Sequence, residues 1–175
     1  MTESPLAGVR VVELAQYVFV PSVGALLADL GADVVRIEHP TRPDPYRGLT
    51  TQGADNSDGG RAGRWAQTNR GKRSLGLDVK SAAGREVFGR VTADADVLLT
   101  SLRLGALRRL GATAKELMAR NPRLVYARGD AYGPAGPEGD APGYDITAFW
   151  ARGGIGDLLT EPGAPMLARQ PAAFG

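Results

Sequence analysis

Short apolar runs, rich in β-branched residues, alternate along this chain with segments of helical periodicity. The apolar runs predict buried parallel strands over residues 9–14, 33–38, 75–79, 96–100 and 124–128. The periodic segments predict helices over about 21–30, 81–92, 105–110 and 114–120, and a further helix opening at Ile146. Strands that alternate with helices favour an α/β protein with an open, mostly parallel, doubly wound (Rossmann-like) sheet and helices on both faces.

The ends of the predicted helices carry residues suited to those positions. Pro21 is placed to begin the first helix, and Gly31 to end it. Ser81 is a suitable N-cap for the second helix, and Asn121-Pro122 ends the fourth. Asp145 precedes the last predicted helix, either as its N-cap or as a group near an active site, and we favour the N-cap.

Two long segments have no periodicity and are predicted to be loops. Residues 40–63 are rich in Pro, Gly, Asp and Asn, and loops of this length are usually functional or mobile. The second such segment covers residues 133–143. Glu38 stands where NAD-binding proteins place a ribose-binding acid. The preceding turn, residues 15–22, lacks the glycines that let a pyrophosphate approach, so the sequence disfavours NAD binding.

Composition and charge narrow the possible chemistry. The chain has 175 residues, enough for one domain with a core, and it contains no cysteine, which excludes disulfides and thiolate nucleophiles. Asp44, Asp55 and Asp58 lack a metal-ligand spacing, so we expect no metal site. A net charge of +2 gives no reason to expect a nucleic-acid partner. Without a membrane-spanning run or a signal-peptide pattern, we expect a cytoplasmic protein with no membrane partner.

Polar and cationic residues follow several predicted strands, at the edge where an open parallel sheet binds ligands. The residues expected there are His39 and the segments 15–18, 101–103 and 130–133. Residues 69–73, by contrast, lie just before a predicted strand. His39 is the only histidine and precedes a proline, which indicates a loop position. Ligand binding or plain exposure therefore suits His39 better than proton transfer.

A series of spaced motifs runs through the chain. The motifs cover residues 8–13, Pro21, 30–38, 69–80, 102–111, Gly143-Tyr144-Asp145 and 152–154. In this order the set resembles the N-terminal half of the class III CoA-transferases, the family that also holds carnitine CoA-transferases, formyl-CoA transferases and 2-methylacyl-CoA racemases. The motifs extend over nearly the whole chain.

The resemblance implies that residues 1–175 are the N-terminal CoA-binding α/β domain of a longer enzyme whose second domain is absent from this chain. The family moves CoA between an acyl-CoA and a carboxylic acid through an aspartyl covalent intermediate. The aspartate is implied directly after Gly175, so no catalytic residue is expected in this chain, which is predicted to be inactive alone. CoA is a substrate, no separate cofactor is implied, and the full-length protein is expected to form an interlocked homodimer.

The motif cations and the residues at the strand ends together give a set of predicted contacts to CoA. The set is Val18, His39, Arg70, Lys72, Arg73, Ser101, Leu102, Arg103, Arg109 and Tyr132. Ser101 departs from the asparagine that the family often has there, and Val18 is the nearest match to a glutamine of some transferases. Arg47 is expected either to contact CoA or to pair with a nearby aspartate, and Trp65 to pack under the long loop.

Two alternatives to a transferase remain open. The first is a 2-methylacyl-CoA racemase, in which Tyr144 stands where the racemases have the histidine of a Gly-His-Asp motif. Because tyrosine has an ordinary pKa of about 10, it is a poor base near neutrality, which favours the transferase. The second alternative is a non-catalytic CoA-binding or dimerisation module.

Overall fold

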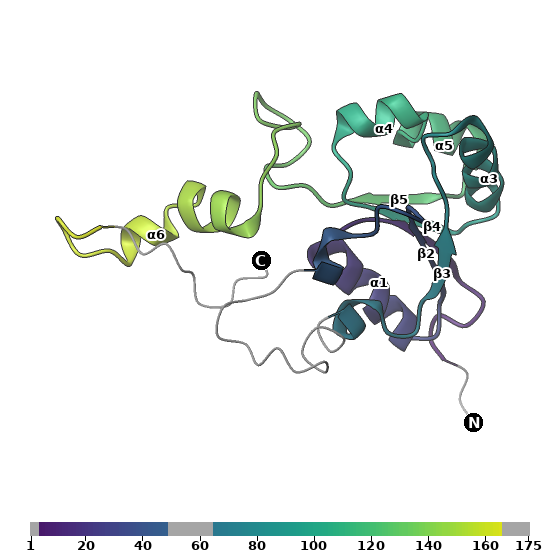
Figure 1. Cartoon of the computed structure of the whole chain (residues 1–175), viewed down its shortest axis with the longest axis horizontal. Helices are drawn as coiled ribbons and strands as arrows, with labels where there is room; N and C mark the ends of the chain where they lie inside the picture. Colours follow the sequence, from purple (N-terminus) through teal and green to yellow (C-terminus); the bar gives the residue numbers. More distant parts are fainter. Residues whose placement is uncertain (1–3, 49–64, 166–175) are drawn as a thin grey trace. The chain divides into compact units, whose positions relative to one another are not determined.

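The computed structural model describes residues 4–48 and 65–165, which fall into two compact units. The first unit ends at Gly129 and contains a β-sheet with helices, whereas the second begins at Asp130 and its regular structure is helical (Figure 1). Most of the predicted loop over residues 40–63 lies outside the described residues. Its described part includes a short 3-10 turn, η1 (Pro45–Gly48).

The first unit is built on a five-stranded parallel sheet, which confirms the predicted fold class. The strands are β1 (Arg10–Leu14), β2 (Asp33–Glu38), β3 (Arg73–Gly76), β4 (Val97–Thr100) and β5 (Val125–Arg128). Their order across the sheet is β3-β2-β1-β4-β5. The chain adds two strands on one side of β1 and then crosses to the other side, so the strand order reverses between β1 and β4. Val12 lies at the centre, paired with Val35 and Leu98.

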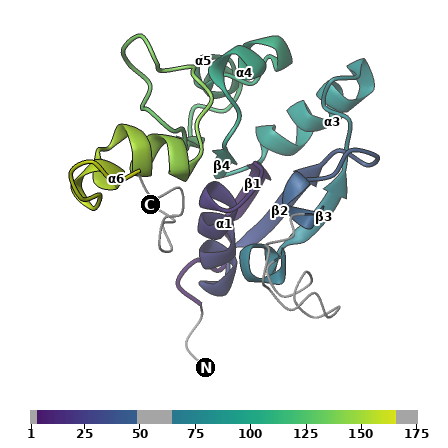
Figure 2. The same ribbon diagram turned by 60° about the vertical axis from the view of Figure 1, so that its left-hand side comes forward.

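Alternate residues of each strand pack into two hydrophobic cores, one on each face of the sheet. Val12 and Leu98 join a core with Leu107, whereas Val11 and Leu99 join a second core on the other face. The first core is covered by α3 (Ala82–Ala93), α4 (Leu104–Leu110) and α5 (Ala114–Arg120), and the second by α1 (Phe19–Asp29), as Figure 2 shows. Helices therefore lie on both faces, as the alternating pattern predicts.

Side-chain caps fix the starts of two helices in the first unit. The Ser81 hydroxyl accepts a hydrogen bond from the Gly84 N–H at 2.9 Å at the start of α3, as predicted. Thr113 and Glu116 form a capping box at the start of α5. Gly31 follows α1 with a φ of +96°, a conformation that favours glycine, so it ends this helix as expected.

Two predicted boundaries are wrong by about two residues. Helix α1 begins at Phe19 rather than Pro21. Pro21 lies in the first turn, where a backbone N–H has no helical partner, so a proline is tolerated there without being the first residue of the helix. Strand β3 runs from Arg73 to Gly76 rather than over 75–79. Among the described residues it pairs with β2 alone, whose last residue, Glu38, lies opposite Gly76, so the ladder ends there. Residues 65–69 add a short helical segment that the pattern did not predict.

The second unit contains a π-helical segment, η2 (Ile146–Arg152), followed by the short helix α6 (Ile155–Leu158). The predicted helix start at Ile146 is confirmed, but the favoured N-cap at Asp145 is wrong. Asp145 has helical backbone angles and makes no capping hydrogen bond, whereas a capping side chain needs an extended backbone. The hydroxyl of Thr147 accepts the Tyr144 N–H instead, at 2.8 Å.

Candidate functional site

A cavity of about 620 Å³ opens at the carboxyl-terminal edge of the sheet in the first unit. Its walls come from the ends of β1 and β2, from residues 77–80 that follow β3, and from α3 and α4. This is the edge at which doubly wound sheets bind ligands, and the volume suits a small organic molecule. The cavity therefore lies where the topology predicts a ligand site.

The cavity combines an apolar wall with a cationic rim, and the carboxylates of Glu38, Asp44 and Asp78 also line it. The apolar part includes Leu14, Ile37, Leu77, Val79, Leu102 and Leu110, and the cations are Arg42, Lys80, Arg85 and Arg109. Arg85 and Arg109 also border a neighbouring hollow of about 540 Å³, to which Arg120 contributes. Such a lining suits a ligand with both an apolar portion and anionic groups. Among the residues that the structure describes, no cluster of acidic, histidine or cysteine side chains could hold a metal ion.

His39 is fixed at the cavity wall by hydrogen bonds from its own loop. Its Nδ1 accepts from the backbone N–H groups of Thr41 and Arg42, both at 3.2 Å, and its Nε2 lies 3.7 Å from Asp78. The Asp78 carboxylate accepts the Lys80 N–H at 2.9 Å, which holds the pKa of Asp78 below its ordinary value. The ring is held as part of a turn, and Asp78 orders the segment that carries Lys80.

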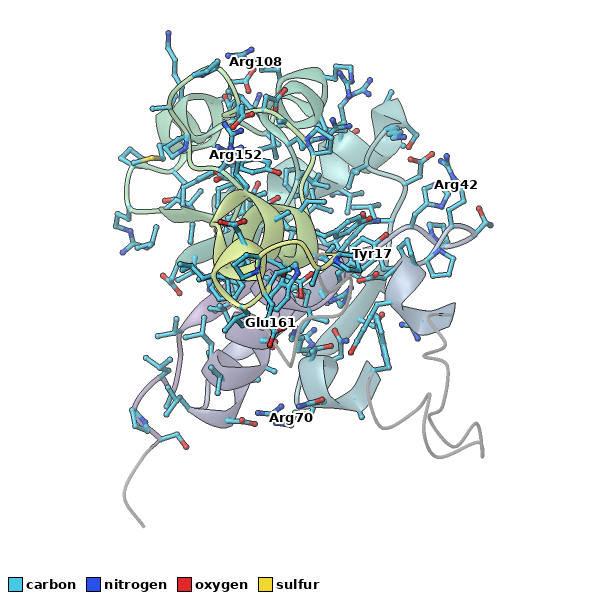
Figure 3. All side chains as sticks on the ribbon, turned by 90° about the vertical axis from the view of Figure 1, so that its left-hand side faces the viewer. Tyr17, Arg42, Arg70, Arg108, Arg152 and Glu161 are labelled. Carbon is cyan, nitrogen blue, oxygen red and sulfur yellow. The ribbon has the colours of Figure 1, made fainter. Side chains whose placement is uncertain are left out.

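The turn between β1 and α1 forms another part of the wall and is held from two sides. The Gln16 N–H donates to the Ser101 hydroxyl at 2.9 Å, which ties the turn to the end of β4. The Tyr17 N–H donates to both carboxylate oxygens of Asp44, at 2.9 and 3.2 Å. Tyr17 has a φ of +64° and is the one non-glycine residue in the left-handed region among those described. Figure 3 labels its position.

A buried chain of alternating charges runs beneath this turn. Lys72 donates to Glu13 at 2.7 Å, Glu13 accepts from Arg36 at 2.7 Å, and Arg36 in turn donates to Asp44. All four side chains are at most 3% exposed. Burial raises the pKa of Glu13, against the opposing effect of Lys72 and Arg36, and burial lowers the pKa of Lys72. Each charge thus depends on its neighbours for compensation.

Arg47 and Glu38 form a further ion pair beside the cavity. Arg47 donates to both Glu38 oxygens, at 2.7 and 2.9 Å, and its guanidinium lies 3.7 Å from the ring centroid of Trp65. Burial opposes ionisation of Glu38, but the hydrogen bonds from Arg47 and from the Asp44 N–H outweigh it and lower the pKa of Glu38. The partner of Arg47 is thus a glutamate rather than a nearby aspartate, and Trp65 stacks on cations.

The structure brings only some of the predicted contact residues to the cavity. His39, Leu102 and Arg109 line it. Ser101 supports the wall through Gln16, Val18 is the N-cap residue of α1, and Arg103 is the exposed N-cap residue of α4. Tyr132 belongs to the second unit. For all of them, contact with CoA stays a prediction.

Arg70, Lys72 and Arg73 do not line the cavity, and each has a carboxylate partner within the chain. Arg70 pairs with Asp29 at the end of α1, and Arg73 pairs with Asp33 at 2.8 Å. Asp33 and Arg73 begin their strands, so this pair lies at the amino-terminal edge of the sheet. Figure 3 accordingly shows Arg70 far from Arg42. Lys72 is buried against Glu13.

Three of the cations on the cavity rim are not among the contacts predicted from the sequence. Lys80 closes the 69–80 motif and could have been found there, because it follows the strand. Arg85 lies in the first turn of α3, where nothing in the spacing distinguishes it from a solvated helix residue. Arg42 comes from the irregular Pro-rich segment, which has no periodic signal.

Comparison with known proteins gives a consistent result. The sequence model of CoA-transferase family III matches residues 6–174. The chain is 37% identical over 164 residues to a cinnamoyl-CoA:phenyllactate CoA-transferase of Clostridium sporogenes, covering 90% of this chain and 38% of that protein. It is 35% identical over 167 residues to a succinate–glutarate CoA-transferase of Agrobacterium fabrum, covering 94% and 42% of the two chains.

Solved structures agree with the sequence matches. A crystal structure of Rv3272 from Mycobacterium tuberculosis superposes with a TM-score of 0.81 at 34% identity, covering 94% of this chain and 44% of that one. A CAIB/BAIF family protein from Brucella suis gives a TM-score of 0.78 at 36% identity, covering 99% and 44%. The chain therefore spans about two fifths of the length of the relatives that it matches.

Proposed function

This chain belongs to CoA-transferase family III, and from this premise we propose that it is the CoA-binding part of an enzyme that moves CoA between an acyl-CoA and a carboxylic acid. The observation that carries the proposal is the cavity at the carboxyl ends of β1 and β2, with its apolar wall and cationic rim. CoA needs this combination, because it joins three phosphate groups to an adenine and a long pantetheine arm.

We assign the phosphates of CoA to the cationic rim. Lys80, Arg85 and Arg109 line the cavity, and the last two also border the neighbouring hollow. Arginine is suited to bidentate phosphate contacts, whereas lysine acts as a point charge. The apolar residues beside them, such as Leu102 and Leu77, supply a surface for the adenine or the pantetheine.

The proposed chemistry needs an aspartate that the family resemblance puts directly after Gly175. In that mechanism the carboxylate attacks the thioester carbonyl, the C–S bond breaks, and a mixed anhydride and CoA thiolate form. The thiolate then attacks the aspartyl carbonyl of the anhydride, releasing the acyl group as a carboxylate and leaving an aspartyl-CoA thioester. An incoming carboxylate takes over the CoA by the reverse sequence. We expect residues 1–175 alone to bind CoA without transferring it.

Two further points belong to the proposal. Tyr144 in place of a histidine favours a transferase over a 2-methylacyl-CoA racemase, since tyrosine is a poor base near neutrality. We also propose that the full-length protein is a homodimer, for which the exposed apolar residues Phe19 and Leu26 on α1 give support. Light scattering on the full-length protein tests this, and a monomer would contradict it.

Calorimetric titration of CoA into the chain tests the proposed function. We expect binding that the double variant Lys80→Gln/Arg109→Gln weakens by at least about tenfold, because two phosphate contacts are lost. The matched control is Arg70→Gln/Arg73→Gln, which removes the same charge at the other edge of the sheet. Lys72 is left unchanged, because it is buried.

The two double variants separate the possible outcomes. Loss of binding in the control variant alone would contradict the cavity assignment and favour the motif cations at residues 70–73. Absence of binding by folded wild-type chain would contradict the proposal for residues 1–175.

A further inference from the structure

Tyr17 holds a backbone conformation that its side chain disfavours, immediately beside the cavity. Its φ of +64° lies in the left-handed region, where the Cβ of a residue other than glycine crowds the backbone. The three residues before it, Leu14, Ala15 and Gln16, all line the cavity. The shape of this part of the wall therefore depends on whatever holds Tyr17 in place.

Asp44 binds the Tyr17 backbone directly. Its carboxylate accepts the Tyr17 N–H with both oxygens and the Tyr46 N–H with one, at 2.9 Å. Hydrogen bonds from backbone N–H groups to an ionised carboxylate are among the stronger ones in proteins. The Asp44 side chain is 1% exposed, so little water competes for these contacts.

Arg36 fixes the position of the Asp44 carboxylate. It donates to the Asp44 carboxylate with one terminal nitrogen, which also contacts the Ala15 carbonyl at 3.3 Å. Its other terminal nitrogen donates to Glu13, which also accepts a hydrogen bond from Lys72. Well-packed apolar residues often give as much stability as a buried ion pair, so such a pair is better explained by the geometry that it imposes.

We propose that Asp44 is a positioning residue for the CoA site: held by Arg36, its carboxylate keeps the Tyr17 backbone left-handed and so sets the wall formed by residues 14–16. The expected effect on CoA affinity rests on the proposed function, whereas the expected effect on the backbone of Tyr17 does not. Asp44 acts through the backbone of Tyr17, so relieving the strain at Tyr17 should remove the need for Asp44.

The first test measures geometry without CoA. Asp44→Asn keeps the shape of the side chain but loses one acceptor oxygen and the charge that pairs with Arg36. We expect amide hydrogen exchange at Tyr17 to accelerate by at least about tenfold, while the amides of β4 keep their rates. The matched control Asp33→Asn, which removes an exposed ion pair, should leave Tyr17 unchanged. Unchanged exchange at Tyr17 in folded Asp44→Asn would overturn the proposal.

The second test measures CoA affinity and its rescue. Asp44→Asn should weaken CoA binding by about tenfold, and Tyr17→Asn in the same chain should restore it to within about threefold, because asparagine tolerates the left-handed region. The single variant Tyr17→Asn measures how much the tyrosine side chain itself contributes to CoA affinity. A purely structural role of Asp44, or direct contact between Asp44 and CoA, predicts that Tyr17→Asn does not restore binding. A failure of Tyr17→Asn to restore CoA affinity would therefore overturn the proposal.

Two controls keep the outcomes distinct. If Asp44→Asn does not fold, Tyr17→Pro replaces it, since proline cannot reach a positive φ and has no N–H. Folded Tyr17→Pro should lose CoA affinity at least about tenfold, and unchanged affinity would overturn the inference. If the wild-type chain binds no CoA, the proposed function fails, whereas Tyr17 exchange still decides the positioning role.

Discussion

Lys72 and Arg109 both belong to motifs that predicted phosphate contacts, yet the structure gives them different surroundings. Arg109 lines the cavity, whereas Lys72 is buried against Glu13, which lies 59 residues earlier in the chain. A motif identifies a cation but not its carboxylate partner when that partner is distant in sequence. His39 and Leu102 were expected near the ligand because they follow predicted strands, and both line the cavity. That expectation depends on sheet topology rather than on distant partners. It could not find Arg42, which comes from an irregular segment.

The buried charge of Lys72 should matter for stability. We expect Lys72→Met to lower the free energy of unfolding by about 3 kcal/mol, because it leaves Glu13 buried with one cation fewer. Arg73→Gln, which breaks an exposed pair, should cost less than about 1 kcal/mol. Urea unfolding of both variants measures the difference. Equal effects would show that Lys72 is not part of a compensated buried chain.

The lowered pKa of Glu38 predicts a pH dependence with a defined sign. A carboxyl group whose pKa is depressed by folding stabilises the protein above its unfolded pKa, near 4.3, and this stability is lost as the pH falls through the folded value. Wild-type protein should exceed Glu38→Gln in stability by no more than about 1 kcal/mol near neutrality, since Arg47 is 43% exposed. Unfolding measured from about pH 6 to pH 3 should show this difference shrinking. A difference that grew on acidification would contradict the assignment.

At the scale of elements, the sequence predicts which segments are helices and strands better than where they end. The apolar run that contains Leu75, Leu77 and Val79 predicted a strand over all three, but β3 stops at Gly76 because β2, its partner among the described residues, ends opposite it. Leu77 and Val79 continue as cavity wall. The apolar pattern of a segment indicates which of its residues are buried. The end of an edge strand depends on where the neighbouring strand ends, and the sequence of the edge strand does not contain that information.

The cap at Ser81 joins an element boundary to the site. Its hydroxyl accepts the Gly84 N–H and donates to the Asp78 carbonyl, both at 2.9 Å, so it fixes α3 to the turn that carries Lys80. We expect Ser81→Ala to destabilise the protein by about 1 kcal/mol, measured by chemical unfolding. Ser81→Thr, which keeps the hydroxyl, is the matched control and should cost less. An unchanged free energy in Ser81→Ala would contradict the capping role.

At the scale of the molecule, the alternating pattern was sufficient to predict a parallel sheet with helices on both faces. The strand order β3-β2-β1-β4-β5 then follows the switch-point arrangement of doubly wound sheets. The division of the described residues into two units at Gly129 has no comparable signal in the pattern of apolar and polar residues. The break falls directly after a strand that the pattern predicted well, and the Gly/Pro-rich residues that follow resemble an ordinary connection.

The proposed function requires CoA to occupy the cavity at the carboxyl-terminal edge of the sheet. Amide hydrogen exchange of the chain with and without CoA tests this location most directly, because bound ligand slows exchange in the segments that it covers. We predict protection at residues 77–80 and 102–110, on the wall and rim of the cavity, and none at residues 70–73. Protection confined to residues 70–73 would contradict the account and place the phosphates at the opposite edge of the sheet.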